Sequence, residues 1–303
     1  MKAHCFEVAA STILMLAALT APAGCDKSAP PTPEAPAASS SGEAVPANST
    51  VSASGSSALQ PLVNAAKEKF EASNRGVSVE VSAGGSKKGL SDVASGAVQI
   101  GDSDIFAPDD LKAQLVDHKV AVVGFAAMAN KGPFNEKIAA ISLTDMAKIF
   151  SGAVTNWKQV GGLSQPIVVI NRAPGSGTRS VFGSIVLGGD KFVESQTEDN
   201  SGALVTKLKQ STGAISYLAL SFADPDLRTF AIKSDAGVVE PGTESITGGT
   251  YPIWSYEHMY TKGEPTGSAK QFLDYLASAD FQEHVVPNVK GFIPITQMKT
   301  TRE

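Results

Sequence analysis

Hydrophobic residues follow two spacings along this chain. Short apolar or alternating runs predict strands at 51–54, 77–81, 98–100, 120–129, 167–170 and 214–218. Apolar residues three and four positions apart predict helices at 59–70, 90–94, 111–116, 143–150, 180–187, 204–208 and 272–276. Shorter extended segments are predicted at 229–232, 251–254 and 292–294. Because strands and helices alternate throughout, the sequence predicts an α/β fold with mostly parallel sheets.

Several predicted strands run into a loop of glycine and serine that is followed by a helix. The loops are 55–57, 84–89 and 174–178. Backbone N–H groups at a helix start lack partners and the helix dipole is positive there, so anions bind at such places. Glycine has no Cβ and lets the backbone approach a ligand closely. In open α/β sheets ligands lie beyond the carboxyl ends of the strands, so these loops are expected to converge.

Charged residues near the loops refine this hypothesis. Arg172 offers a forked, charged donor that fits a tetrahedral oxyanion. Asp102 and Asp104 follow a predicted strand, but one acidic loop without further oxygen ligands does not predict a metal site. Lys87 and Lys88 are interpreted as solvated. Each loop also has a simpler interpretation, since unliganded Gly-Ser-Gly-Thr turns and serine N-caps are common.

The first 25 residues are interpreted as a signal peptide. Lys2 precedes the apolar run 8–19, which is too short to span a bilayer. The segment 21–25 resembles a bacterial lipoprotein cleavage box, which implies lipidation at Cys25; a secreted protein without lipid is the alternative. Residues 26–49 are rich in Ala, Pro and Ser and are expected to form a disordered tether.

Composition excludes some classes of function. The chain has 303 residues, 18% of them charged, and a formal net charge of −5, which argues against nucleic acid as the main partner. Any anion-binding site must therefore be formed by a few neighbouring residues and not by a broad basic surface. Its 2 cysteines are Cys5 and Cys25, so no disulfide and no thiolate metal site is expected in the folded part. No cofactor is predicted.

Several motifs together resemble a known family. Residues 54–62, 101–104 and 172–178 resemble the anion-binding loops of the phosphate-binding proteins of bacterial ABC-type phosphate transporters. The segments 213–217 and 251–253 also have counterparts there. The resemblance extends from about Val51 to about Pro294.

The resemblance implies a two-lobed periplasmic-binding-protein-like fold of type II. Each lobe would be a mostly parallel sheet flanked by helices, with two chain crossings as the hinge. Lobe one would comprise 51–128 and 250–303, and lobe two 129–249. The implied function is extracytoplasmic phosphate binding and delivery to the permease of an ABC transporter, by a monomer anchored to the membrane through lipid, in the periplasm or at the cell surface.

The resemblance also implies which residues bind phosphate. On lobe one they are Ser57, the N–H of Ala58, Ser86 and Asp104; on lobe two they are Arg172, Ser176, Gly177 and Thr178. A carboxylate at Asp104 accepts a hydrogen bond from the P–OH of phosphate, whereas sulfate has no proton to offer. This argues against the alternative of a receptor for molybdate, tungstate or sulfate.

Two other classes of function are weighed against binding. An enzyme would need a nucleophile or a metal, but Ser176 lacks the glycines of a nucleophile elbow. His118, His258 and His284 have no motif around them and are interpreted as surface or packing residues in helices or turns. A phosphate-sensing or adhesion protein on the same fold remains an alternative, because fold does not fix function. The protein is therefore predicted not to be an enzyme.

Overall fold

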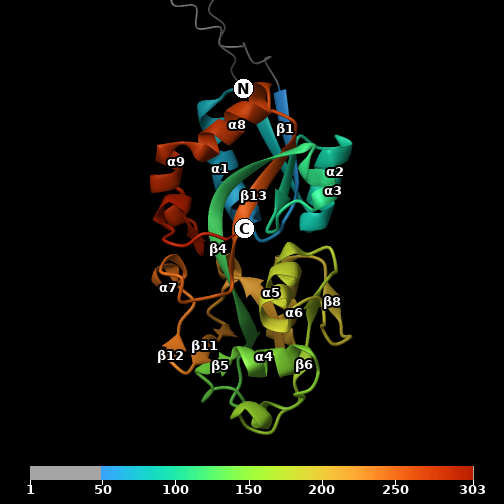
Figure 1. Ribbon diagram of the computed structural model, residues 1–303, viewed down its shortest axis with the longest axis vertical. Coiled ribbons are helices and arrows are strands. Elements are labelled where there is room, and N and C mark those ends of the chain that lie inside the picture. Colours follow the sequence, from blue (N-terminus) through green and yellow to red (C-terminus); the bar gives the residue numbers. More distant parts are fainter. Residues whose placement is uncertain (1–48, 303) are drawn as a thin grey trace, which may run out of the picture. The chain divides into compact units, whose positions relative to one another are not determined.

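A computed structural model describes residues 49–302 (Figure 1). The expected signal peptide, Cys25 and the tether lie outside the described residues, except that Ser49 already belongs to the first strand. Within the described range, none of the helices combines the length and the apolar composition that a membrane span requires.

A mixed sheet of nine strands forms the centre of the fold. Its main path, in spatial order, is β2 (Val77–Ala83), β1 (Ser49–Gly55), β3 (Ile100–Ser103), β13 (Trp254–Lys262), β4 (Leu115–Asn130), β9 (Ala214–Ala219) and β6 (Val168–Val169). The strands β10 (Leu227–Thr229) and β14 (Phe292–Ile293) also pair with β4. The short strands outside this sheet are β5 (Ala140–Ser142), β7 (Asn171–Arg172), β8 (Thr197–Glu198), β11 (Ala231–Ser234) and β12 (Gly237–Val239).

The direction of the strands differs from the prediction. The pairs β1–β2, β1–β3 and β6–β9 are parallel, as expected. However, β4 is antiparallel to β13, β9, β10 and β14, and β13 is antiparallel to β3. The α/β class is confirmed, but mostly parallel sheets were the wrong expectation, because the two long strands in the middle of the sheet, β4 and β13, are antiparallel to each other and to their other neighbours.

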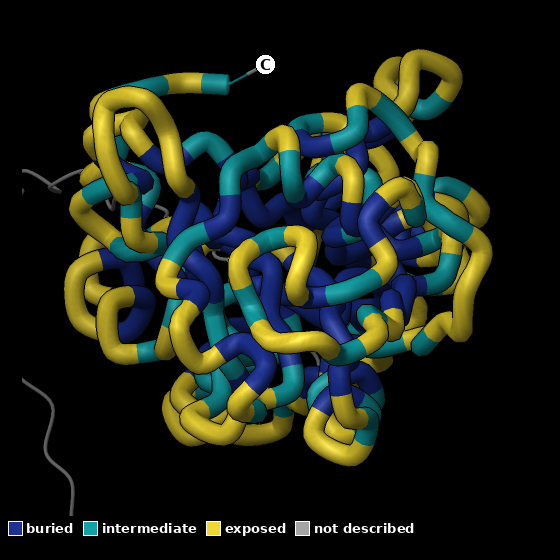
Figure 2. The backbone as a smooth tube through the Cα atoms, turned by 90° about the horizontal axis from the view of Figure 1, so that it is seen from below, coloured by how far each residue is buried: buried dark blue, intermediate teal, exposed yellow. Residues whose placement is uncertain are grey.

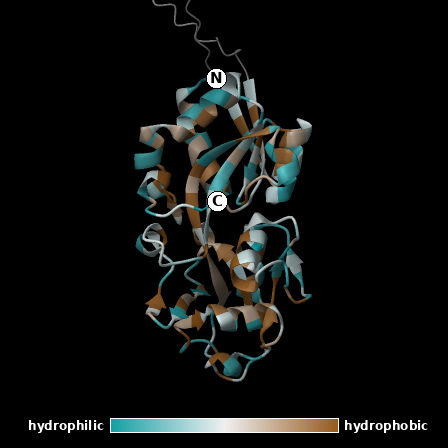
Figure 3. Ribbon diagram, viewed as in Figure 1, coloured by the Kyte–Doolittle hydropathy of each residue, from teal (hydrophilic) through white to brown (hydrophobic). Residues whose placement is uncertain are grey.

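The long strand β4 runs through both halves of the sheet. It pairs with β13 as far as Gly124 and with β9 from Phe125 onward. Residues 120–129 are all buried, and Figure 3 shows hydrophobic colouring along this strand. A strand covered on both faces is expected to be apolar throughout, which explains why it was predicted from sequence. The division into lobes at 129 and 250 stays a prediction.

Helices cover the sheet. They are α1 (Gln60–Ser73), α2 (Ser86–Ser95), α3 (Asp109–Lys112), α4 (Leu143–Phe150), α5 (Gly177–Leu187), α6 (Ser201–Gln210), α7 (Thr243–Thr247), α8 (Gly267–Ala277) and α9 (Ala279–His284). Figure 2 shows the buried segments gathered inside and the exposed ones outside. Apolar faces explain the burial: α1, for example, buries Leu62, Val63, Ala66 and Phe70.

Some elements were misjudged from sequence. The helix expected at 111–116 ends at Lys112, and the chain enters β4 at Leu115. Of the nine-residue strand β13, the sequence predicted only Trp254, as the end of an extended segment at 251–254. His118 lies in β4 and His258 in β13, so the expectation that they lie in helices or turns was wrong. In β13 aromatic rings stand at every second position, at Trp254, Tyr256, His258 and Tyr260, a strand period that the sequence interpretation overlooked.

Two acidic side chains are buried within this sheet. Asp102 on β3 and Glu257 on β13 are both fully buried, and none of their four carboxyl oxygens has a hydrogen-bond partner. Burial raises the pKa of Asp102 well above its usual value, and the nearby charge of Asp104 adds to this. The folded state therefore favours the neutral acid at Asp102.

We expect Asp102→Asn to change how stability depends on pH. In the unfolded chain Asp102 ionises near pH 4, while in the folded chain it keeps its proton. The contribution of Asp102 to stability is thus present at low pH and is lost as pH rises towards the raised folded-state pKa. The variant should gain on the wild type by up to about 1.4 kcal/mol per pH unit above about pH 4.

Urea unfolding of both proteins across this range, in buffer without phosphate, measures the difference. A difference in the free energy of unfolding that does not change with pH would contradict a neutral Asp102.

Candidate anion-binding site

The first wall of the site is built by the segments that follow β1 and β2. After β1 the Ser56 hydroxyl accepts hydrogen bonds from the N–H groups of Ala58, at 3.0 Å, and Leu59, at 3.3 Å, which fixes the turn before α1. After β2 the chain turns at Gly85 and α2 starts with Ser86. The Ser86 hydroxyl accepts from the N–H of Asp104 at 2.9 Å, which ties the loop after β3 to this wall.

The second wall begins with α5. Ser176 is the N-cap of this helix, and its side chain accepts from the N–H of Arg179 at 3.2 Å. Gly177 is the first helical residue and lies directly against the first wall. A Cβ built on Gly177 would overlap the Ser86 hydroxyl and lie 2.8 Å from Ser86 Cβ and 2.9 Å from Asp104 Cβ. Only glycine permits this approach.

A further helix start completes the second wall. Asn200 caps α6 by accepting from the N–H of Ala203 at 2.9 Å, and Ser201 follows as the first helical residue. The hydroxyl oxygens of Ser201 and Ser57 lie 3.0 Å apart. The N termini of α1, α2, α5 and α6 therefore face one region, where their dipoles favour negative charge.

Arg172 provides the positive charge of this region. Its side chain comes from β7 and is buried, with 1% of its surface exposed. Its guanidinium donates to the hydroxyl of Ser57 at 3.1 Å and to that of Ser201 at 3.2 Å. It also donates to the carbonyl oxygens of Glu198 and Asp199, both at 3.2 Å. Burial lowers the pKa of Arg172, and the charge of Asp104 opposes this shift.

Asp104 provides the acceptor. Its Oδ2 accepts from the Thr178 hydroxyl at 2.8 Å, and its Oδ1 accepts from the Ser56 hydroxyl. The Ser255 hydroxyl on β13 donates to the Asp104 carbonyl at 2.8 Å. The side chain is 1% exposed. A carboxylate has about four lone-pair positions, so Asp104 retains acceptor capacity beyond these two donors.

The structure brings all the predicted site residues together. Ser57, Ala58, Ser86, Asp104, Arg172, Ser176, Gly177 and Thr178 are all buried. The N–H of Ala58, which was expected to contact phosphate, donates to the Ser56 hydroxyl within its own loop. Lys87 and Lys88 are exposed, and Lys88 pairs with Asp92 on its own helix, as the solvated interpretation expected.

Two polar residues of the site were missed from sequence. Ser56 was interpreted as a possible cap, but its hydroxyl bonds Asp104. Ser201 was not singled out at all. The signal was present, since an N-cap asparagine and a Ser-Gly pair precede the apolar positions Leu204 and Leu208. Only the fold shows that this helix starts beside Arg172.

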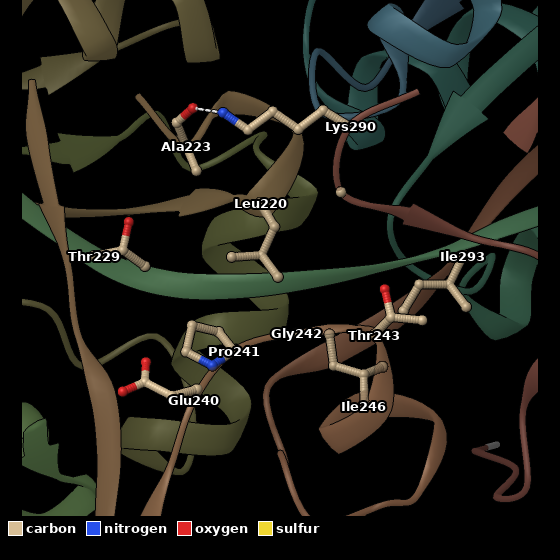
Figure 4. A pocket seen from close by; sticks show the side chains of 11 residues that line it. Leu220, Ala223, Thr229, Glu240, Pro241, Gly242, Thr243, Ile246, Lys290 and Ile293 are labelled. Carbon is tan, nitrogen blue, oxygen red and sulfur yellow. Dashed lines mark hydrogen bonds between the residues drawn. The ribbon is translucent and has the colours of Figure 1, made fainter. Parts of the chain in front are cut away.

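One pocket borders the site, and a second contains none of the site residues. One of about 440 Å³ borders Asp104 and is lined by Phe106, Ser180, Ser184 and Arg302 among others. Another, of about 350 Å³, is lined by Leu220, Ile246, Lys290 and Ile293 among others (Figure 4). Leu220 and Ile246 pack against Gly124, where β4 passes from one half of the sheet to the other.

Neither pocket suggests a metal centre. Across residues 49–302, no group of three or more His, Cys, Asp or Glu side chains is arranged to hold a metal ion. His258 bonds Asp117 at 2.7 Å between Nδ1 and Oδ1, and it packs between Phe106 and Tyr260. Arg172 and Asp104 instead offer a buried charged donor and a buried acceptor within one region.

Known proteins share this arrangement of elements. Residues 32–280 match the PBP superfamily domain. The phosphate-binding protein PstS of Bacillus subtilis is 47% identical over 261 residues, which cover 85% of this chain and 84% of that protein. PstS of Staphylococcus saprophyticus is 25% identical over 240 residues, covering 75% and 74%.

Solved structures agree with the sequence matches. One, from Clostridium perfringens, is described as a phosphate ABC transporter substrate-binding protein with bound phosphate. It superimposes with a TM-score of 0.75 at 29% identity and covers 82% of this chain and 100% of that one. An ABC-type phosphate transport receptor from Vibrio cholerae shares the fold with a TM-score of 0.64 at 22% identity, covering 81% and 100%.

These matches confirm the predicted periplasmic-binding-protein-like fold. The chain belongs to the PBP superfamily and, within it, to the phosphate-binding proteins of bacterial ABC-type phosphate transporters, which are binding proteins and not enzymes.

Proposed function

We propose that this protein binds inorganic phosphate among Ser57, Ser86, Arg172 and the start of α5, and delivers it to the permease of an ABC-type transporter. The proposed ligand contacts are those named from the sequence, except the N–H of Ala58, which donates to Ser56, together with Ser201. PstS of Bacillus subtilis and the phosphate-bound protein of Clostridium perfringens support the choice of ligand.

The hydrogen-bond pattern of the serine hydroxyls carries this proposal. Each hydroxyl has one proton to donate and two lone pairs with which to accept. Ser57 accepts from Arg172 and from the N–H of Ser201, Ser86 from Asp104 N–H, and Ser176 from Arg179 N–H. At Ser86 and Ser176 the protein thus occupies an acceptor position and leaves the hydroxyl proton to donate to an anion, whereas the Ser57 hydroxyl lies within hydrogen-bond distance of Ser201 Oγ, at 3.0 Å.

Arg172 adds charge to this neutral set of donors. Of the proposed contacts it is the one that carries a positive charge, and it holds Ser57 and Ser201 from opposite walls. Unpaired N–H groups in the first turn of α5, at Gly177 and Thr178, supply further donors. An anion enclosed in this way exchanges its water for fixed dipoles that already point at it.

Asp104 would make the site selective. Phosphate near neutral pH still carries a P–OH that can donate to the carboxylate, whereas sulfate cannot. With sulfate, an acceptor would face an acceptor, which costs about 1–3 kcal/mol or more for a charged group. We propose that this contact distinguishes phosphate from sulfate, molybdate and tungstate.

We further propose that the two walls belong to lobes that close over the ligand. Lobe one would comprise 51–128 and 250–303, and lobe two 129–249, with the crossings in β4 and just before β13. Contacts between the walls support a closed arrangement: the N–H of Lys87 donates to the carbonyl of Gly175 at 3.1 Å. Such two-crossing hinges allow lobes to move as units.

The setting of the protein is also a proposal. The leader and Cys25 support an extracytoplasmic protein that is lipid-anchored to the membrane, in the periplasm or at the cell surface. A monomer fits a site that one chain builds by itself. The membrane permease would receive phosphate when the lobes open.

Titration calorimetry on the purified protein tests the ligand. We expect phosphate to bind and sulfate and molybdate to bind at least about tenfold more weakly, because they offer Asp104 no proton. Equal binding of phosphate and sulfate would contradict the selectivity, and no heat with phosphate would contradict the proposed function.

Asp104→Asn tests the origin of selectivity. The amide can donate as well as accept, so it no longer penalises an anion without a proton. We expect the ratio of phosphate to sulfate affinity to narrow by about tenfold or more, measured by the same calorimetry. A ratio equal to that of the wild type would show that Asp104 does not select the ligand.

Gly177→Ala tests closure. The added Cβ would meet Ser86 and Asp104 across the site, and overpacking of this kind costs about 1–3 kcal/mol. Phosphate affinity should fall by about tenfold to a hundredfold. Gly175→Ala is the matched control, since a Cβ there meets nothing within 4 Å. Equal affinities of the two variants would argue against the close approach at Gly177.

A further inference from the structure

Three carboxyl side chains lie together behind the anion site. Asp102, Asp104 and Glu257 have 0%, 1% and 0% of their surface exposed. In the antiparallel pairing of β13 with β3, Met259 lies opposite Asp102 and His258 opposite Ser103. Continued by one residue, this register would bring Glu257 next to Asp104, whose carbonyl accepts from the Ser255 hydroxyl on the same strand.

The hydrogen bonds of this group are incomplete if all three acids are ionised. Asp104 accepts from Ser56 and Thr178, but both oxygens of Glu257 lack a partner. Neighbouring carboxylates cannot satisfy one another, because each can only accept. A buried charge without a partner is strongly unfavourable, so such a group takes up a proton.

A proton on Glu257 resolves this arrangement. Burial raises the pKa of Glu257 well above its usual value, and the charges of Asp104 and Asp102 act in the same direction. The pKa of Asp102 is raised by burial and by the charge of Asp104. Of these two acids, Glu257 lies on the strand that also bonds Asp104 through Ser255.

The positive charge near Asp104 belongs to Arg172 and does not act on Glu257. Arg172 acts on Asp104, but its guanidinium bonds Ser57 and Ser201 and the carbonyls of residues 198 and 199. The charges that act on Glu257 are those of Asp104 and Asp102, both negative when ionised. A neutral carboxylic acid is thus the form of Glu257 that suits its surroundings.

We propose that Glu257 is a positioning residue for the anion site: as a neutral acid it donates a hydrogen bond to Asp104 and orients that carboxylate towards the P–OH of phosphate. This inference rests on the proposed function. Ser56 and Thr178 hold the two oxygens of Asp104 from the site side, and Glu257 holds the carboxylate from the core side. These three donors occupy three of the about four lone-pair positions of the carboxylate, which leaves one for the ligand.

Two variants separate this role from simple packing. Glu257→Gln keeps a donor of the same length, while Glu257→Met keeps the length and removes the donor. Both remove the ionisable group. We expect the Gln variant to bind phosphate within about threefold of the wild type and the Met variant to bind at least about tenfold more weakly, by calorimetry. Unfolding midpoints, measured in parallel, report any general loss of stability.

Carboxyl carbon NMR of the wild type measures the proton itself. With ¹³C-labelled protein near neutral pH, Glu257 should give the upfield signal of a protonated carboxyl group, and this signal should be missing in Glu257→Gln. An ionised Glu257 would overturn the inference, even if Glu257→Met failed to fold.

The outcomes distinguish the role of Glu257 from the proposed phosphate binding on which it rests. Wild type that binds phosphate, together with a Met variant that binds it equally well, would overturn the role of Glu257 and leave the proposed function intact. Wild type that binds no phosphate would overturn both.

Discussion

The site depends on the convergence of four helix N termini on one enclosed region. Ser57 precedes α1, Ser86 and Ser201 begin α2 and α6, and Ser176 caps α5. An anion removed from water needs many donors but little added charge, since a surplus of cations would bind any anion equally well. Helix starts supply such donors, because their N–H groups have no partner within the helix. Arg172 then needs to add only one full charge.

Glycine at the meeting point makes this convergence possible. Gly177 stands where α5 touches the wall that carries Ser86 and Asp104. The loops before α1 and α2 are short and follow β1 and β2 directly, so the nine-stranded sheet fixes their positions, while α5 and α6 follow the short strands β7 and β8. β4 connects the two halves of that sheet, and its buried apolar residues anchor both. The two halves of the sheet are therefore held together by a strand that carries none of the proposed site residues.

Much of this could be predicted from sequence, for identifiable reasons. The loops at 55–57, 84–89 and 174–178 carry local signals, namely glycine, serine and a change from strand to helix period. Ser201 was missed because it becomes part of the site only through its distance to Arg172. The strand β13 was missed although its aromatic rings recur at every second position, from Trp254 to Tyr260. The antiparallel course of β4 and β13 was also missed, because strand direction is set by tertiary pairing and not by local pattern.

Glu257 illustrates what only tertiary structure can reveal. In the sequence it stands between aromatic residues and a histidine, in a stretch that resembles neither a loop nor a motif. Its position near the acidic residues of β3 follows from the register in which β13 pairs with β3. An acceptor with the role proposed for Asp104 must be held as firmly as the donors around it, since a carboxylate that can turn away would accept from water instead. Donors on opposite sides of Asp104 meet that requirement, and the acid chemistry of Glu257 allows one of them to come from the core.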